Sequence, residues 1–99
     1  MSQISRYVEA AERDNTRRSY AAAIRHFEVE WKGLLPTTAD ATSRYLADHA
    51  ATLAISTLRQ RLAALSRWHI DHGFADPTKA PLVRQVLKGI RSIHSVAEK

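Results

Sequence analysis

Apolar residues recur along this chain at the three- and four-residue spacing of amphipathic helices, and no segment alternates over a useful length as a strand would. The first apolar stripe comprises Ile4, Tyr7, Val8 and Ala11. The polar run RDNT then interrupts the pattern, and we expect Asp14 or Asn15 to cap a second helix over residues 16–32. The apolar face of that helix comprises Tyr20, Ala23, Ile24, Phe27 and Trp31. Gly33 follows as its expected C-terminal stop.

Two further helices are expected after the loop GLLPTT. Thr37 and Asp40 have the spacing of a capping box, which predicts a helix over residues 38–50. Its apolar side comprises Thr42, Tyr45, Leu46 and Leu53 and is the weakest of the set. Ser56 is expected to cap the next helix and Gly73 to end it. The apolar stripe of this helix comprises Leu58, Leu62, Leu65 and His69.

A fifth helix is expected over residues 79–93, after a turn in which Asp76 precedes Pro77 and therefore disfavours helix. Pro81 is tolerated there because it falls in the first turn. The pattern predicts an all-α fold, a compact bundle of four to five short helices. The residues expected to be buried together are Tyr20, Ile24, Phe27, Trp31, Leu58, Leu62, Leu65, Val86 and Ile90.

The composition fits one folded domain, since 99 residues suffice for a modest core and the hydrophobic fraction of 44% is ordinary for a globular chain. The chain has no cysteine, which excludes disulfides and thiolate chemistry and suits the reducing cytoplasm. No apolar run approaches the ~20 residues of a membrane span, and the first residues lack the apolar region of a signal peptide. We therefore expect a cytoplasmic protein with no membrane partner.

The net charge of +5 is distributed unevenly. Residues 1–55 carry seven basic and seven acidic side chains, whereas residues 56–99 carry eight basic and three acidic ones. A basic half beside a neutral half is typical of proteins that bind a polyanion. The alternative is a merely soluble basic protein without such a partner.

Metal binding and catalysis find little support in the sequence. His69 and His72 lie three residues apart, but no third ligand is near them, and His69 continues a leucine stripe as a packed core histidine would. Tyr7, Tyr20 and Tyr45 each fall on an apolar stripe and are expected to be core aromatics. The chain has no glycine-rich phosphate loop and no G-x-S-x-G motif. We expect no metal, no cofactor and no enzyme complete within these residues.

Arginines are expected at the start of two helices, Arg17 and Arg18 in one and Arg59 and Arg61 in the other. Positive charge near a helix N-terminus opposes the helix dipole by roughly 0.3–1 kcal/mol per charge. Beside a phosphate the same placement is favourable, because backbone N–H groups and guanidinium groups both bind the anion. Arg59 and Arg61 project about 200° apart and cannot contact one site equally. A further basic row comprises Arg84, Lys88 and Arg91. The alternative is a set of scattered, solvated arginines.

Three motifs in this order and spacing carry a family resemblance. They are NT-R-R-x-Y at the expected start of the second helix, S-T-L-x-x-R-L-x-A-L-x-x-x-H in the fourth, and P-x-V-R-x-V-L-K-G-I-R in the fifth. Over roughly residues 4–95 the chain resembles the N-terminal core-binding domain of tyrosine recombinases, the phage integrase family of site-specific recombinases. The resemblance implies a SAM-like helical bundle that forms one half of a clamp around duplex DNA during integration and recombination.

The resemblance also implies that the second and fourth helices face the major groove. By motif position the DNA-facing residues are Thr16, Arg18, Ser19, Ser56, Thr57, Gln60 and Arg61, with Ala64 beside them. The basic residues Arg17, Arg59, Lys88 and Arg91 complete the candidate contacts.

The family's catalytic residues belong to a second, C-terminal domain, and no residue here matches their motifs. We expect residues 1–91 to be the DNA-binding domain, residues 92–99 to begin an interdomain linker or tail, and the chain to be a truncated product without activity of its own. The expected partners are double-stranded DNA and the catalytic domain of the parent protein, and the isolated chain is expected to be a monomer. The alternative function is a stand-alone helical adaptor whose basic face binds an acidic protein.

Overall fold

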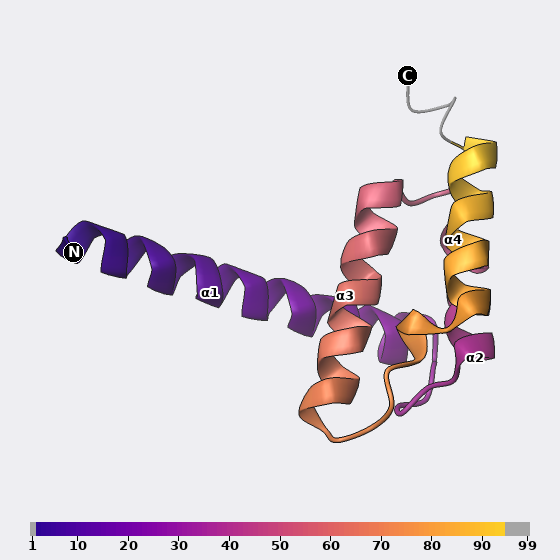
Figure 1. The fold of residues 1–99 in the computed structure, drawn as a ribbon, viewed down its shortest axis with the longest axis horizontal. Helices are drawn as coiled ribbons and strands as arrows, with labels where there is room; N and C mark the ends of the chain where they lie inside the picture. Colours follow the sequence, from indigo (N-terminus) through magenta and orange to yellow (C-terminus); the bar gives the residue numbers. More distant parts are fainter. Residues whose placement is uncertain (1, 95–99) are drawn as a thin grey trace.

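Four α-helices and two short helical segments form the structure, a computed structural model that describes residues 2–94. They are, in chain order, α1 (Gln3–Arg25), η1 (His26–Glu30), α2 (Ala39–His49), α3 (Ile55–Asp71), η2 (Pro77–Lys79) and α4 (Pro81–His94). η1 is a π-helix that continues α1, and η2 is a 3-10 turn. No strand occurs in the described residues, so the predicted all-α class is confirmed. Figure 1 shows α2, α3 and α4 gathered around the C-terminal end of α1.

α1 is one continuous helix of 23 residues, which corrects the break expected at RDNT. Asp14 lies inside the helix, where its carboxylate pairs with Arg18 at 2.8 Å and with Arg17 at 3.5 Å. The cap is instead Ser2, whose hydroxyl accepts a hydrogen bond from the backbone N–H of Ser5. A polar run without glycine or proline costs a helix only a few tenths of a kcal/mol per residue, and these i, i+4 pairs offset part of that cost.

The N-terminal half of α1 projects from the rest of the molecule as an arm, residues 3–13 (Figure 1). Its apolar side chains are exposed, with 75% of Ile4 and 67% of Tyr7 open to solvent. The stripe that contains them is turned by roughly 130° around the helix from the face that carries Ala23 and Phe27. One straight helix therefore cannot bury both faces against the same body. The expectation that Tyr7 is a core aromatic is wrong.

Two hydrophobic clusters replace the single core that the sequence predicts. The first consists of Phe27, Tyr45 and Leu65, which join η1, α2 and α3. Partly buried Ile24 and Trp31 pack against this cluster. Phe27 and Tyr45 meet edge to face with ring centroids 5.0 Å apart, an arrangement that aromatic pairs favour.

The second cluster consists of Leu46, Leu58, Val83 and Ile90, and it joins α2, α3 and α4. α2 and α3 contribute to both clusters and therefore hold the two halves of the body together. The residues of the predicted core that are buried are Phe27, Leu58, Leu65 and Ile90. Those that are half-buried are Tyr20, Ile24, Trp31, Leu62 and Val86.

Two helix starts differ from the expected caps. The hydroxyl of Thr38 caps α2 by accepting a hydrogen bond from the backbone N–H of Ala41 at 3.1 Å, so the cap lies one residue after the expected Thr37. α3 begins after Ala54, which makes no side-chain cap, and Ser56 lies inside the first turn. The local preference of serine for caps is outweighed here because Ile55 packs against the second cluster from within the helix.

One helix end agrees with the expectations, and two differ from them. Gly73 follows α3 with a φ of 77°, the left-handed conformation that glycine adopts readily. After η1 the left-handed residue is Lys32, with a φ of 64°, rather than Gly33. α4 continues through His94, so the domain boundary expected after residue 91 falls inside this helix, and residues 95–99 of the expected tail lie outside the described residues. Among the described helices, none is long and apolar enough to cross a membrane.

Candidate nucleic-acid interface

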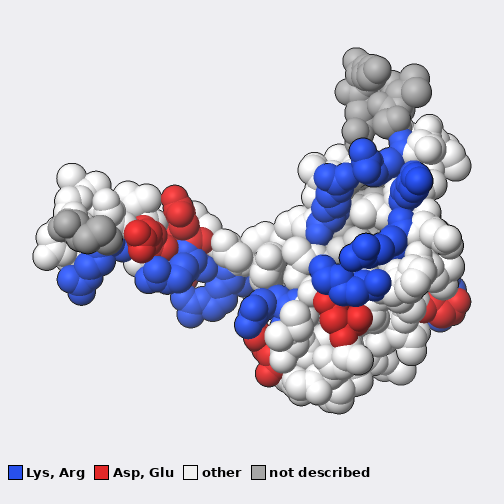
Figure 2. Space-filling view, in the orientation of Figure 1, with Lys and Arg blue, Asp and Glu red and all other residues white. Residues whose placement is uncertain are grey.

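Basic side chains dominate the C-terminal part of the fold. Residues 55–94, which form α3, η2 and α4, contain seven lysines and arginines but only two aspartates. Figure 2 shows Lys and Arg side chains gathered over α3 and toward α4, with few acidic side chains among them. Such a face attracts a polyanion and repels other cations.

α1 and α3 cross, and the crossing brings part of the predicted site together. The side-chain amide of Gln60 donates a hydrogen bond to the hydroxyl of Ser19, with 2.6 Å between the two atoms. Thr57 and Arg61 lie on the same face of α3 as Gln60, and His26 follows Ser19 by two helical turns on α1 and η1. We call these five residues (Ser19, His26, Thr57, Gln60 and Arg61) the crossing surface.

Arg61 lies close to the aromatic cluster beneath the crossing surface. Its guanidinium is near enough to the hydroxyl of Tyr45, which is fully buried, to affect the pKa of that hydroxyl. Burial raises the pKa of Tyr45, although Arg61 opposes this shift. The same hydroxyl is 2.7 Å from Nδ1 of His26. Burial lowers the pKa of His26, and the positive charge of Arg61 lowers it further.

Arg17 and Arg18 are not at a helix start, because α1 continues through them, so the dipole argument does not apply to these two residues. Both are mostly exposed and pair with Asp14. Exposed ion pairs of this kind contribute about 0–1 kcal/mol, so a phosphate can replace the carboxylate at small cost. Arg18 directly precedes Ser19 of the crossing surface.

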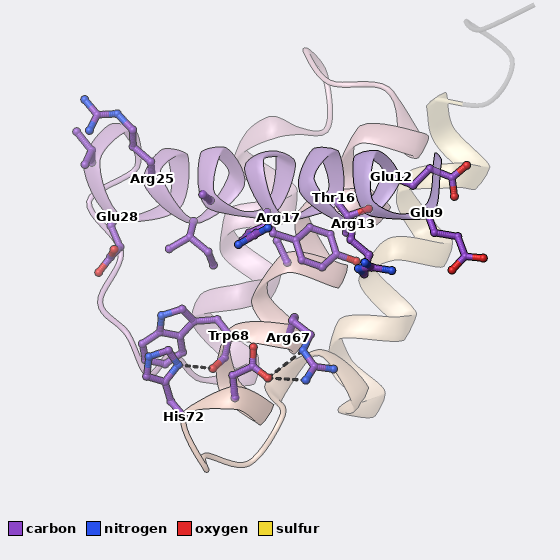
Figure 3. A pocket seen from close by; sticks show the side chains of 16 residues that line it. Glu9, Glu12, Arg13, Thr16, Arg17, Arg25, Glu28, Arg67, Trp68 and His72 are labelled. Carbon is purple, nitrogen blue, oxygen red and sulfur yellow. Dashed lines mark hydrogen bonds and ion pairs between the residues drawn. The ribbon is translucent and has the colours of Figure 1, made fainter. Parts of the chain in front are cut away.

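Thr16 and Arg17 lie on a different side of α1, where they line a groove of about 940 Å³ between α1 and α3. Figure 3 shows them above Trp68 and His72, which belong to the C-terminal part of α3. The indole of Trp68 stacks on the imidazole of His72 with 4.1 Å between ring centroids. The structure therefore does not bring Thr16 and Arg17 together with Arg61.

Ala64 is only 1% exposed, so it cannot contact a duplex, and its place among the candidate contacts is wrong. A small residue is required there because it lies on the face of α3 that α1 covers: Gln60 one turn earlier contacts Ser19, and Trp68 one turn later lines the groove beside α1. The sequence motif was enough to align Ala64 with a DNA-facing position, but it contains no information about whether this residue is buried.

The remaining basic candidates lie elsewhere on the body. Arg59 lines a second hollow, of about 400 Å³, together with Arg67 and Lys79. The expected divergence of Arg59 from Arg61 is therefore confirmed. Lys88 and Arg91 are exposed on α4, whose Val83 and Ile90 face the second cluster, and Ser56 is exposed at the start of α3.

His69 is fully buried, which confirms its expected place in the core. Its Nδ1–H donates to the carbonyl oxygen of Leu65 at 2.7 Å, and its Nε2 accepts from the backbone N–H of Thr37 at 3.0 Å. Both ring nitrogens are thus satisfied in the neutral form. Within residues 2–94, no group of three His, Asp or Glu side chains is placed to hold a metal ion.

Sequence reasoning missed His26, which lies near Arg61, and His49, whose ring contacts that of His26. It also missed Lys79, which lines the same hollow as Arg59. One signal was available for His26, since it follows Ser19 by seven residues and so shares its helix face. No local signal exists for His49 or Lys79, because other elements bring them to these sites.

Compared with known proteins, the chain matches no family model and no curated protein. The recombinase resemblance accordingly rests on the motifs quoted above.

Proposed function

We propose that this chain is a cytoplasmic DNA-binding module of a site-specific tyrosine recombinase or integrase, which grips duplex DNA as one half of a clamp and has no catalytic activity of its own. The hydrogen bond between Gln60 and Ser19 carries the proposal, because it joins the two helices that the motifs assign to the DNA. Arg61 lies on the same surface, in a part of the chain with a strong excess of basic residues.

The contacts available on this surface suit phosphates more than base edges. Arg61 is half-buried and lies beside the Tyr45 hydroxyl, which restricts how far its guanidinium can extend. Arg18 is exposed and flexible, and hydroxyls and amides such as those of Thr57 and Gln60 commonly bind phosphate oxygens. Since the clamp has a second half, we expect the chain alone to bind duplex DNA in the non-specific range, on the order of 10⁻⁴–10⁻⁶ M at physiological salt.

The test is a fluorescence-anisotropy titration of a short labelled duplex at several salt concentrations. Arg18→Ala and Arg61→Ala should each weaken binding to all sequences and lower the slope of log affinity against log salt by about 0.9, the value for one neutralised phosphate. If Arg61 instead reads a guanine edge, its loss should cost about 1–3 kcal/mol on the cognate site and much less on random DNA.

Arg17→Ala is the matched control. Arg17 pairs with the same carboxylate as Arg18 and is equally exposed, at 78% against 76%, but it lines the groove on another side of α1. Its replacement should change the affinity and the slope less than Arg18→Ala does. Unchanged affinity and slope in the double variant Arg18→Ala, Arg61→Ala would refute the assignment of the crossing surface to DNA.

The adaptor function is distinguished by the same titration with an acidic polypeptide in place of DNA. Binding to polyglutamate as tight as to duplex DNA would favour an acidic protein partner. The recombinase assignment has a separate test in the gene. A reading frame that continues past Lys99 into an Arg…His-x-x-Arg…Tyr pattern supports it, and a continuation without that pattern contradicts it.

A further inference from the structure

Three side chains that can carry positive charge meet at the edge of the crossing surface. His26 comes from η1, His49 from the last turn of α2 and Arg61 from α3, and all three are half-buried. The ring centroids of His26 and His49 are 4.9 Å apart, and that of Tyr45 is 5.7 Å from the first and 4.7 Å from the second. A site where cations converge is stabilised by an anion.

Hydrogen bonds determine which nitrogen of His26 carries its proton. Nδ1 of His26 is 2.7 Å from the Tyr45 hydroxyl, and the positive charge of Arg61 near that hydroxyl favours the arrangement in which its oxygen faces the guanidinium and its proton is given to Nδ1. Nε2 of His26 then carries the proton and is a donor while the ring is neutral. The π-helix η1 begins at His26, and such segments occur frequently at functional sites.

His49 is arranged in the opposite way. Its Nδ1 is 2.8 Å from the carbonyl oxygen of Tyr45, which only accepts, so Nδ1 carries the proton of the neutral ring. Nε2 of the neutral ring is therefore an acceptor. It becomes a donor only when the ring takes up a second proton and a positive charge.

Three other charged or titratable groups lie near the cluster, namely Glu30, Tyr45 and Asp48. Burial and the positive charges of Arg61 and His49 lower the pKa of His26, whereas Glu30 on η1 raises it in part, so His26 stays a neutral donor near neutral pH. Burial raises the pKa of Tyr45, which keeps its hydroxyl protonated. Asp48 on α2 is engaged by Nε1 of Trp31, 2.7 Å from its carboxylate.

We propose that Arg61, His26 and His49 form a binding site for one phosphate group of duplex DNA, and that His49 takes up a proton when the phosphate binds. The inference rests on the proposed function. It adds His26 and His49 to the residues that bind DNA, and it adds the uptake of one proton to the binding step. Arg61 supplies a permanent charge, and His26 supplies a neutral Nε2–H donor. Protonated His49 adds a second charge and a third donor, and the phosphate compensates the repulsion among these cations. DNA affinity should therefore rise as the pH falls.

The experiment measures duplex affinity of the full chain at constant ionic strength between about pH 6 and pH 8, the range in which histidine titrates. The wild type should bind about three- to tenfold more tightly at the lower pH, within the limit of tenfold per pH unit for each linked proton. His49→Gln should lose most of this tightening, so that its affinity changes by less than about twofold between the two pH values. His26→Phe should weaken binding at both values.

His72→Gln is the matched control, because Nδ1 of His72 also contacts the carbonyl oxygen four residues earlier, at 2.7 Å, yet this residue lines the separate groove. It should keep the full pH dependence. Circular dichroism shows whether each variant is folded. If the wild type binds no duplex at any pH, the proposed function fails; if it binds and His49→Gln keeps the wild-type pH dependence, only this inference is overturned.

NMR spectra of the histidine rings distinguish the source of the phosphate. The ring signals of His49 should titrate at higher pH with duplex than without it, while those of His72 stay unchanged. The same shift with inorganic phosphate alone shows a site that binds phosphate from either source, and a shift with duplex only shows one that requires the DNA backbone. No shift of the His26 and His49 signals with either probe overturns the site.

Discussion

Gly33 packs so closely against the core that adding a single methyl group at this position would disturb it. A Cβ atom at this position would collide with the ring of Phe27, which is fully buried in the first cluster. The backbone N–H of Gly33 also donates to the carbonyl oxygen of Phe27 at 2.8 Å, so the chain cannot easily move away from the ring. Gly89 in α4 is the opposite case, because a Cβ atom there meets open space.

Gly33→Ala should therefore lower the free energy of unfolding by about 1–3 kcal/mol, the usual effect of overpacking. Gly89→Ala should raise it by up to ~1 kcal/mol, because alanine favours the helix interior. Urea unfolding followed by circular dichroism measures both variants against the wild type. Equal effects of the two substitutions would contradict the close packing of Gly33 on Phe27.

Single residues also show where sequence reasoning reaches its limit. The leucine stripe was enough to predict that His69 is buried, because burial follows from periodicity along one helix. Its hydrogen bond to the backbone of Thr37 joins residues 32 positions apart, and no local pattern contains that information. The same holds for His49, which reaches the crossing surface only through the packing of α2 against η1.

Among the elements, α1 is the one that sequence reasoning misjudged. Asp and Asn are frequent at helix caps, and the apolar stripe changes face near residue 14, so both local signals indicated a break. In the structure the helix does not break where the apolar stripe moves to another face. It continues, and the apolar stripe of the arm stays exposed to solvent. The bounds of α2, α3 and α4 were predictable within about two residues because each has a single buried stripe.

The arm should contribute little to the stability of the body, since every side chain of residues 2–13 is exposed. A variant without these residues should have a free energy of unfolding within about 0.5 kcal/mol of the wild type and a smaller helical signal by circular dichroism. Phe27→Ala, in the buried part of the same helical run, should cost about 3–5 kcal/mol and serves as the comparison. A large loss of stability on removing the arm would show that it packs against the body.

For the molecule as a whole, the sequence predicted the basic excess of the C-terminal half but not how the basic residues divide among surfaces. Arg17 and Arg18 are neighbours in sequence, yet only Arg17 lines the groove between α1 and α3. Arg59 and Lys79 come from different elements and line the same hollow. The direction of each side chain depends on how α1 crosses α3, and that angle is a property of the packed clusters rather than of any one helix.

The overall shape yields a final prediction. The radius of gyration is 15.2 Å, whereas a compact domain of this length has a value of about 13 Å, and the excess comes from the projecting arm. Small-angle X-ray scattering of the monomer should give a radius near the larger value for the full chain and near the smaller one for the variant without residues 2–13. A dimer would also raise the radius, so light scattering must first confirm the monomer mass of 11.1 kDa. A full-length monomer with a radius of about 13 Å would mean that the arm folds back onto the body in solution, which a bend at the polar run of residues 13–16 would permit.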